Sequence, residues 1–226
     1  MDRFERVLPF MRRPERQWER RLTLRQRLLS VLILPSVAFW DIVRELDNRG
    51  PLFIFAGNIL AVSLFYVAMV VHVINAAVLG LFLEFAGILL VYAILHFAWA
   101  MIYFGIIHGI VRVSGREGVF AETFLLGQYS QMPLLITNAI SLLLLLAGLP
   151  FNVPLDQIAL LTLSPMWLVV WALTIGAWLW GAVLLALGLR ERYSFSTGAA
   201  LFLTLAVTLF ATIVWLVVRL TPTPII

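Results

Sequence analysis

The chain has no cysteine and no lysine, and only 12% of its 226 residues are charged. Without cysteine it can form no disulfide, no thiolate metal site and no cysteine nucleophile. All sixteen basic residues are arginine, a bias that favours a GC-rich, prokaryotic source. With 62% hydrophobic residues, too little polar surface remains to cover a soluble globular domain.

Five long segments also lack any Asp, Glu, Lys or Arg: 50–83, 85–111, 123–155, 157–189 and 193–218. Each can supply the roughly 20 apolar residues that cross the hydrocarbon core of a bilayer. Their apolar runs are continuous and do not alternate with polar residues, which indicates helices and not barrel strands. The sequence therefore predicts an all-α fold, a polytopic membrane helical bundle with five transmembrane helices.

Turn and capping residues place the span ends. We expect a turn over Asp47–Pro51 and a fourth span that opens at Pro165 after an N-capping serine. The predicted spans are 52–74, 86–111, 129–149, 165–189 and 197–219, with a short outer helix or loop over 155–163. Together, residues 50–226 form the predicted transmembrane domain.

Residues 1–49 form the predicted cytosolic part, an Arg-rich tail followed by an amphipathic segment. Residues 22–46 mix charges with an apolar run that is too short to span a bilayer. This pattern predicts an N-terminal amphipathic interfacial helix, bent at Pro35. An ordinary cytosolic helix packed on the bundle is the alternative.

The arginines predict an orientation in the cell membrane. Arg112 and Arg116 lie on the second connector and Arg190 and Arg192 on the fourth, whereas the first and third connectors carry only acids. Because arginine-bearing connectors stay inside, we expect a cytosolic N-terminus and an extracytosolic C-terminus. The two cytosolic loops resemble each other. They either stack with crossed Arg–Glu pairs or are solvated independently.

Partners follow from the charge distribution. The first 49 residues hold eleven arginines against seven acids, a basic balance that favours membrane lipids as partners. No nucleic acid is expected, because acids interleave with the arginines and no binding fold accompanies them.

The spans carry no internal charge, which counts against an ion pump, a proton relay or a voltage sensor. Two spans do carry polar and aromatic stripes. These stripes either bond helices together or line an intramembrane groove. The groove candidates are Tyr92, His96, Trp99, Tyr103, Gln131 and Asn138.

No motif in the sequence indicates an enzyme. The three histidines are far apart in the sequence and lack carboxylate partners, so no metal is predicted. Catalytic motifs are also missing, and we expect no enzyme, no catalytic residue and no cofactor.

Several short motifs resemble a known family. They are the Asp47-x-x-Gly50-Pro51 turn, the glycine-rich loop from His108 to Gly118, and the run Gly127-Gln-Tyr129-Ser-Gln-Met-Pro133. Over residues 28–218 the chain resembles the Yip family of Ypt/Rab-interacting proteins, as a prokaryotic-type member. The resemblance implies a role like that in membrane trafficking, with homo- or hetero-oligomers formed with family members.

Eukaryotic members bind Rab-type GTPases and carry longer cytosolic N-terminal regions, so no Rab-type GTPase is expected for the 49 residues here. We expect a non-enzymatic integral membrane protein that organises membrane or recruits partners through its cytosolic loops. The alternative is a lipid or small-solute transporter with the polar-aromatic groove. The interaction candidates are Asp47, Gly50, Pro51, Arg116, Glu117, Gly127, Tyr129, Pro133, Arg190 and Glu191.

Overall fold

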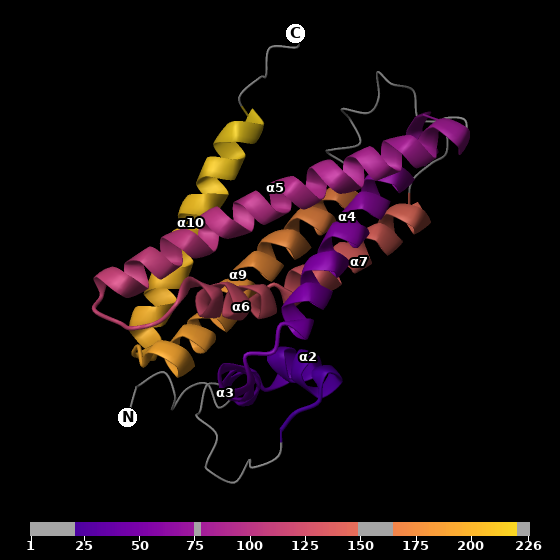
Figure 1. Ribbon diagram of the computed structural model, residues 1–226. Coiled ribbons are helices and arrows are strands. Elements are labelled where there is room, and N and C mark those ends of the chain that lie inside the picture. Colours follow the sequence, from indigo (N-terminus) through magenta and orange to yellow (C-terminus); the bar gives the residue numbers. More distant parts are fainter. Residues whose placement is uncertain (1–20, 75–77, 149–164, 221–226) are drawn as a thin grey trace. The chain divides into compact units, whose positions relative to one another are not determined.

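The computed structural model describes residues 21–74, 78–148 and 165–220, and every regular element in these ranges is a helix (Figure 1). The helices are α2 (Leu24–Ile33), α3 (Pro35–Glu45), α4 (Arg49–Ile74), α5 (Val78–Val113), α6 (Phe120–Ser130), α7 (Met132–Gly148), α9 (Pro165–Tyr193) and α10 (Thr197–Leu220). The predicted outer segment 155–163 lies outside the described residues.

In the described part of the chain, five helical segments are long and apolar enough to cross a membrane: α4, α5, α6 together with α7, α9 and α10. This confirms the predicted all-helical, multi-pass fold. Many of their large apolar side chains are exposed, among them Leu143 at 65% and Phe202 at 77%. Such surfaces suit lipid, which solvates apolar side chains but cannot bond to backbone groups.

The first span begins earlier than predicted, because Asp47 caps it. The Asp47 carboxylate accepts a hydrogen bond from the Arg49 backbone N–H at 3.0 Å, and α4 begins at Arg49. Gly50 and Pro51 therefore lie in the first helical turn and not in a preceding turn. Proline is tolerated there because its missing N–H has no intrahelical acceptor in a first turn.

The third span begins earlier than the predicted residue 129, and it is divided into two helices. The helical backbone begins at Phe120 and is interrupted at Gln131, between α6 and α7. Pro133 explains the interruption, because it has no N–H for the Tyr129 carbonyl four residues earlier and its ring would crowd that carbonyl. The predicted starts of the fourth and fifth spans, Pro165 and Thr197, are confirmed.

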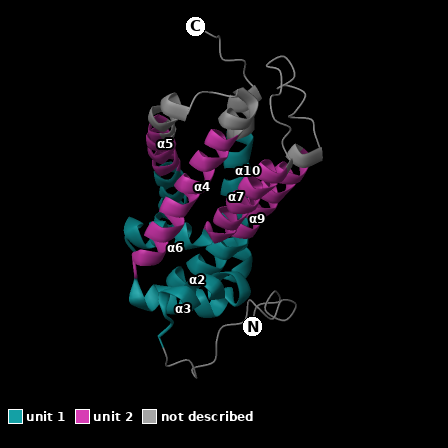
Figure 2. Cartoon of the chain, turned by 90° about the vertical axis from the view of Figure 1, so that its right-hand side faces the viewer, with its two compact units in different colours: residues 1–46, 100–130, 182–226 teal, residues 47–99, 131–181 magenta. Residues whose placement is uncertain are grey.

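The chain divides into two compact units (Figure 2). Unit 1 comprises residues 1–46, 100–130 and 182–226. Its core is apolar and includes Phe39, Ile42, Phe104, Ile107, Leu126, Leu184, Leu185 and Leu187, each less than 2% exposed. This core packs α2 and α3 with α6 and with the parts of α5, α9 and α10 that belong to the same unit.

Unit 2 comprises residues 47–99 and 131–181, and within it α4 packs along α7. Gly57 allows the close approach of these two helices. A Cβ at Gly57 would lie only 2.9 Å from Leu135 Cδ1, so a larger residue would require the Leu135 side chain to move.

Candidate functional site

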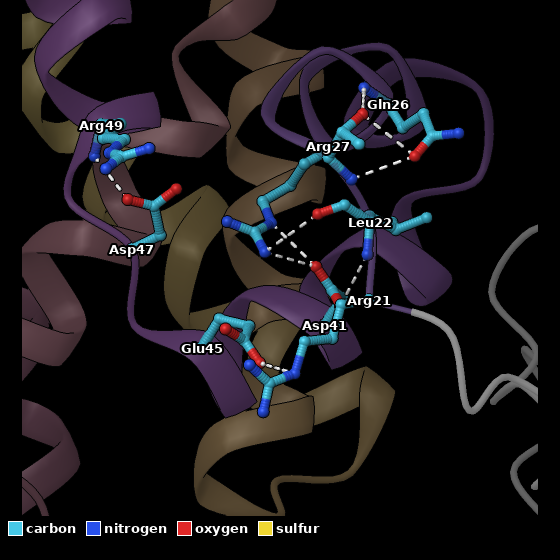
Figure 3. A network of polar contacts seen from close by, with 9 residues as sticks. Arg21, Leu22, Gln26, Arg27, Asp41, Glu45, Asp47 and Arg49 are labelled. Carbon is cyan, nitrogen blue, oxygen red and sulfur yellow. Dashed lines mark hydrogen bonds and ion pairs between the residues drawn. The ribbon is translucent and has the colours of Figure 1, made fainter.

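An ion pair joins the two helices that precede the first span. The Arg27 guanidinium lies 2.7 Å from the Asp41 carboxylate, and both side chains are nearly buried (Figure 3). Asp41 also accepts the Leu22 backbone N–H at 3.3 Å. The helices themselves follow from local sequence, since Thr23 and Gln26 form a capping box for α2 and Pro35 opens α3. The pair thus fixes α2 against α3.

Arg27 keeps its charge in this buried position. Burial lowers the pKa of Arg27, but interactions with Asp41 and with the Tyr129 side chain raise it by more, so the net shift of the pKa is upward. Tyr129 is itself fully buried. Tyr129 was a predicted interaction residue, but its side chain is buried next to Arg27.

A second buried arginine joins two other segments to the end of α9. The Arg190 guanidinium at the end of α9 donates to Ser36 of α3 at 3.2 Å and to Thr197 at the start of α10 at 3.4 Å. It also binds the neighbouring Glu191 carboxylate at 2.7 Å. Arginine suits this position because its five donors form a planar fork that can satisfy several acceptors at once.

The two loops that carry the paired arginines stack on each other. Arg192 donates to Glu122 at 2.6 Å, and the Arg116 guanidinium lies 5.2 Å from the centre of the Phe195 ring. The interpretation of stacked loops is therefore confirmed, and that of independent solvated loops is wrong. One crossed Arg–Glu pair is present, whereas Arg190 pairs with its neighbour Glu191. In the crossed pair, the arginine comes from one loop and the glutamate from the start of α6, which follows the other.

Hydroxyl and imidazole groups next to the two stacked loops form a hydrogen-bonded chain. The Thr123 hydroxyl lies 2.8 Å from the Tyr193 hydroxyl and 3.0 Å from His108 Nδ1. It links α6, α9 and α5 within unit 1.

Gly127 has a packing role on the same helix. A Cβ at this position would overlap the Phe104 ring. Gly127 therefore lets α6 lie directly on that ring. Glycine is required here by this internal packing and not by a contact at the surface.

The structure separates the predicted interaction residues into three groups. Arg116 and Glu117 are exposed, whereas Gly127, Tyr129 and Arg190 are buried in unit 1. The Glu191 side chain is only 7% exposed. Asp47, Gly50, Pro51 and Pro133 lie at the first turns of α4 and α7, in unit 2.

The named interaction candidates did not include the partners that complete the network: Arg27, Ser36, Asp41, Glu122, Thr123, Arg192, Tyr193 and Thr197. One local signal existed. Arg27 and Val31 lie one turn apart on the buried face of α2, so a charge occupied an otherwise apolar helical face.

The groove candidates also divide between the units. Tyr103 belongs to unit 1, where its hydroxyl lies 2.7 Å from the Thr208 hydroxyl of α10. In unit 2, Tyr92 stacks on His96 with ring centres 5.7 Å apart, and Asn138 donates to Asn58 at 2.9 Å. The side chains of Tyr103 and Asn138 therefore bond neighbouring helices, whereas Trp99 is half-buried at the end of the first segment of unit 2.

Within the described ranges, no three His, Asp or Glu side chains lie close enough together to hold a metal ion. The polar atoms of the site are instead arranged in ion pairs and hydrogen bonds that join helices.

A family model described as the Yip1 domain matches residues 29–219. The chain belongs to the Yip family. The match covers most of the chain and confirms the resemblance carried by the Gly-Pro turn, the glycine-rich loop and the α6–α7 junction. It also supports, with the five apolar helices, an integral multi-pass membrane protein. Yip proteins are in general non-enzymatic. Comparisons with curated proteins and with solved structures gave no match.

Proposed function

We propose that this Yip protein organises membrane or recruits partners through the exposed surface of its two stacked loops, without catalysing a reaction. We call this the loop surface and define it by the exposed residues Arg112, Ser114, Arg116, Glu117, Ser194 and Ser196. The observation that carries the proposal is the Arg192–Glu122 pair, which ties one loop to the helix that follows the other. The exposed charges are thereby held in place before a partner arrives, which lowers the entropic cost of binding.

The charge of the loop surface favours an acidic partner. Arg112 and Arg116 outnumber Glu117, and all three are exposed. Anionic lipid head groups and acidic segments of another Yip protein both fit this balance. Arg190 and Glu191 contribute indirectly, because they hold the loop ends from inside unit 1.

The proposal includes an orientation in the cell membrane, with the N-terminus and both loops cytosolic. Because the chain has no cysteine, a single introduced cysteine reports one position cleanly. A Ser114→Cys variant is expected to react with a membrane-impermeant maleimide only from the cytosolic side, and Val153→Cys only from the outside. Labelling of position 153 from the cytosol alone would reverse the orientation.

The interaction itself can be tested by exchanging two charges. An R116E/E117R variant keeps composition and net charge, so the orientation signal of the loop is preserved. Its matched control is N48R/R49N, which exchanges two exposed residues at the start of α4. Each variant carries a photoreactive residue at position 194 and is crosslinked in its native membrane.

We expect a discrete adduct, with lipid or with a second Yip chain, that persists in the control and is lost in R116E/E117R. Equal adducts in both variants would show that the loop surface is not where the partner binds.

A further inference from the structure

Unit 2 buries polar side chains inside membrane-spanning helices. Asn58 lies nine residues after the start of α4, about 14 Å along the helix axis and therefore near the middle of a hydrocarbon core about 30 Å thick. Asn58 and Ser63 of α4 are fully buried, and Ser141 of α7 is 5% exposed. These positions are far from either aqueous surface.

The polar side chains of unit 2 lie on three neighbouring helices, α4, α5 and α7. Asn138 of α7 donates to Asn58 of α4 at 2.9 Å, and Ser141 lies one turn beyond Asn138. The Phe55 ring of α4, one turn before Asn58, lies 5.4 Å from the His96 ring of α5. α4 is therefore in contact with both of the other helices.

The start of α7 completes the arrangement. The Gln131 side chain, immediately before α7, lies next to His96. Amide, imidazole and hydroxyl groups thus follow one another along the facing sides of α4, α5 and α7.

The hydrogen bonds between these helices leave several of the buried polar atoms without a partner. Among the described residues, five buried polar atoms of unit 2 have no hydrogen-bond partner: Asn58 Nδ2, Ser63 Oγ, His96 Nε2, Gln131 Oε1 and Ser141 Oγ. Lipid tails offer no donors or acceptors, so contact with lipid could not satisfy these atoms. Contact between helices explains the Asn58–Asn138 bond and also brings His96 and Gln131 within reach of each other. It leaves Asn58 Nδ2, Ser63 Oγ and Ser141 Oγ unexplained.

We propose that unit 2 holds water inside the bilayer, at the unpartnered buried atoms of Asn58, Ser63 and Ser141. Buried polar atoms that lack protein partners are where proteins hold internal water, which bonds to two to four such groups. Water fits these atoms because it is small and neutral and both donates and accepts hydrogen bonds. The atoms include donors and acceptors but belong to no carboxylate, arginine or lysine. This site goes beyond the proposed loop surface and lies in the other unit.

Cysteine reactivity tests the site directly. Only a thiolate reacts quickly with methyl methanethiosulfonate, and thiolate forms where water is present. In a dry apolar site the pKa of a thiol rises, and each pKa unit removes about nine-tenths of the thiolate. Ser141→Cys is a nearly isosteric probe, and Ser63→Cys repeats the test from α4.

Two controls lie on α7 beyond Ser141. Leu145, one turn further along, is an apolar residue with 1% exposure, and Leu143 is 65% exposed. Both lie nearer the end of α7, so distance to bulk water alone would favour labelling of the controls. All variants are measured in liposomes after a monodisperse elution has shown that they fold.

We expect the cysteines at positions 141 and 63 to react at least about tenfold faster than those at 143 and 145. Adding N58L/N138L to the Ser141→Cys variant is expected to slow its reaction to the rate of Leu145→Cys, because the amides that hold water are gone. The proposal is overturned if positions 141 and 63 react as slowly as position 145. It is also overturned if the double leucine variant leaves the rate at position 141 unchanged.

Discussion

Replacing Asp41 by leucine is expected to release α2 from α3. The Arg27–Asp41 pair has side-chain exposures of only 4% and 6%, and the charged atoms are 2.7 Å apart. Without Asp41, the guanidinium of Arg27 stays buried with no carboxylate, and the Leu22 backbone N–H loses its acceptor. Removing one partner of a buried pair costs about 3–5 kcal/mol, mainly through the charge left behind.

The double variant R27M/D41L is expected to be more stable than either single variant. With both charges gone, no unpaired ion remains, and methionine and leucine can fill the apolar space between α2 and α3. The remaining cost is the lost bond between Arg27 and Tyr129, about 1–3 kcal/mol for a buried polar group without its partner. The two substitutions are therefore strongly non-additive.

Hydrogen exchange of the α2 backbone amides, measured in detergent micelles, reports this release as local opening. A loss of 3 kcal/mol corresponds to roughly 150-fold faster exchange in the Asp41→Leu variant. R27M/D41L is expected to exchange more slowly than Asp41→Leu.

Glu45→Gln is the matched control on the same pair of helices, because the Arg21–Glu45 pair has side-chain exposures of 81% and 27%. An exposed pair contributes at most about 1 kcal/mol, so we expect less than roughly fivefold faster exchange. If Asp41→Leu changes exchange no more than Glu45→Gln, the buried pair does not hold α2. The reasoning also fails if the effects of Arg27→Met and Asp41→Leu simply add.

Three further predictions concern unit 1, all measured as unfolding of the detergent-solubilised protein. Gly127→Ala is expected to destabilise by about 1–3 kcal/mol, because its methyl group would overlap the Phe104 ring; an unchanged midpoint would contradict this packing. Glu122→Gln is expected to cost at most about 1 kcal/mol, less at high salt, since Arg192 is 31% exposed; a salt-independent loss would count against the pair. Thr208→Val is expected to cost about 0.6 kcal/mol, typical of a hydrogen bond between membrane helices, and no loss should remain once its tyrosine partner on α5 is also removed.

The spans could be predicted from sequence because hydropathy and capping act locally. Pro165 and Thr197 mark the starts of α9 and α10, as their positions in the sequence indicated. The third span could not be placed as well. Its apolar run continues across Gln131, whereas the break there depends on a missing N–H at Pro133, which hydropathy does not register.

The loop contacts could be predicted only in part. The likeness of the two loops suggested that they stack, and the Arg192–Glu122 pair confirms it. The sequence did not indicate which arginine would pair with which glutamate. Glu122 and Arg192 are 70 residues apart, and residues 101–226 hold four acidic residues: Glu117, Glu122, Asp156 and Glu191.

The sequence by itself determined that this is a five-span membrane protein with arginines on alternate connectors, because both properties depend on the composition of short segments. The tertiary structure decided what the arginines do. Arg116 is exposed, whereas Arg190, in an equally charged loop, is 1% exposed and bonds to Ser36, 154 residues away. Burial depends on which distant segments pack around a side chain, and the composition of a short segment does not determine that.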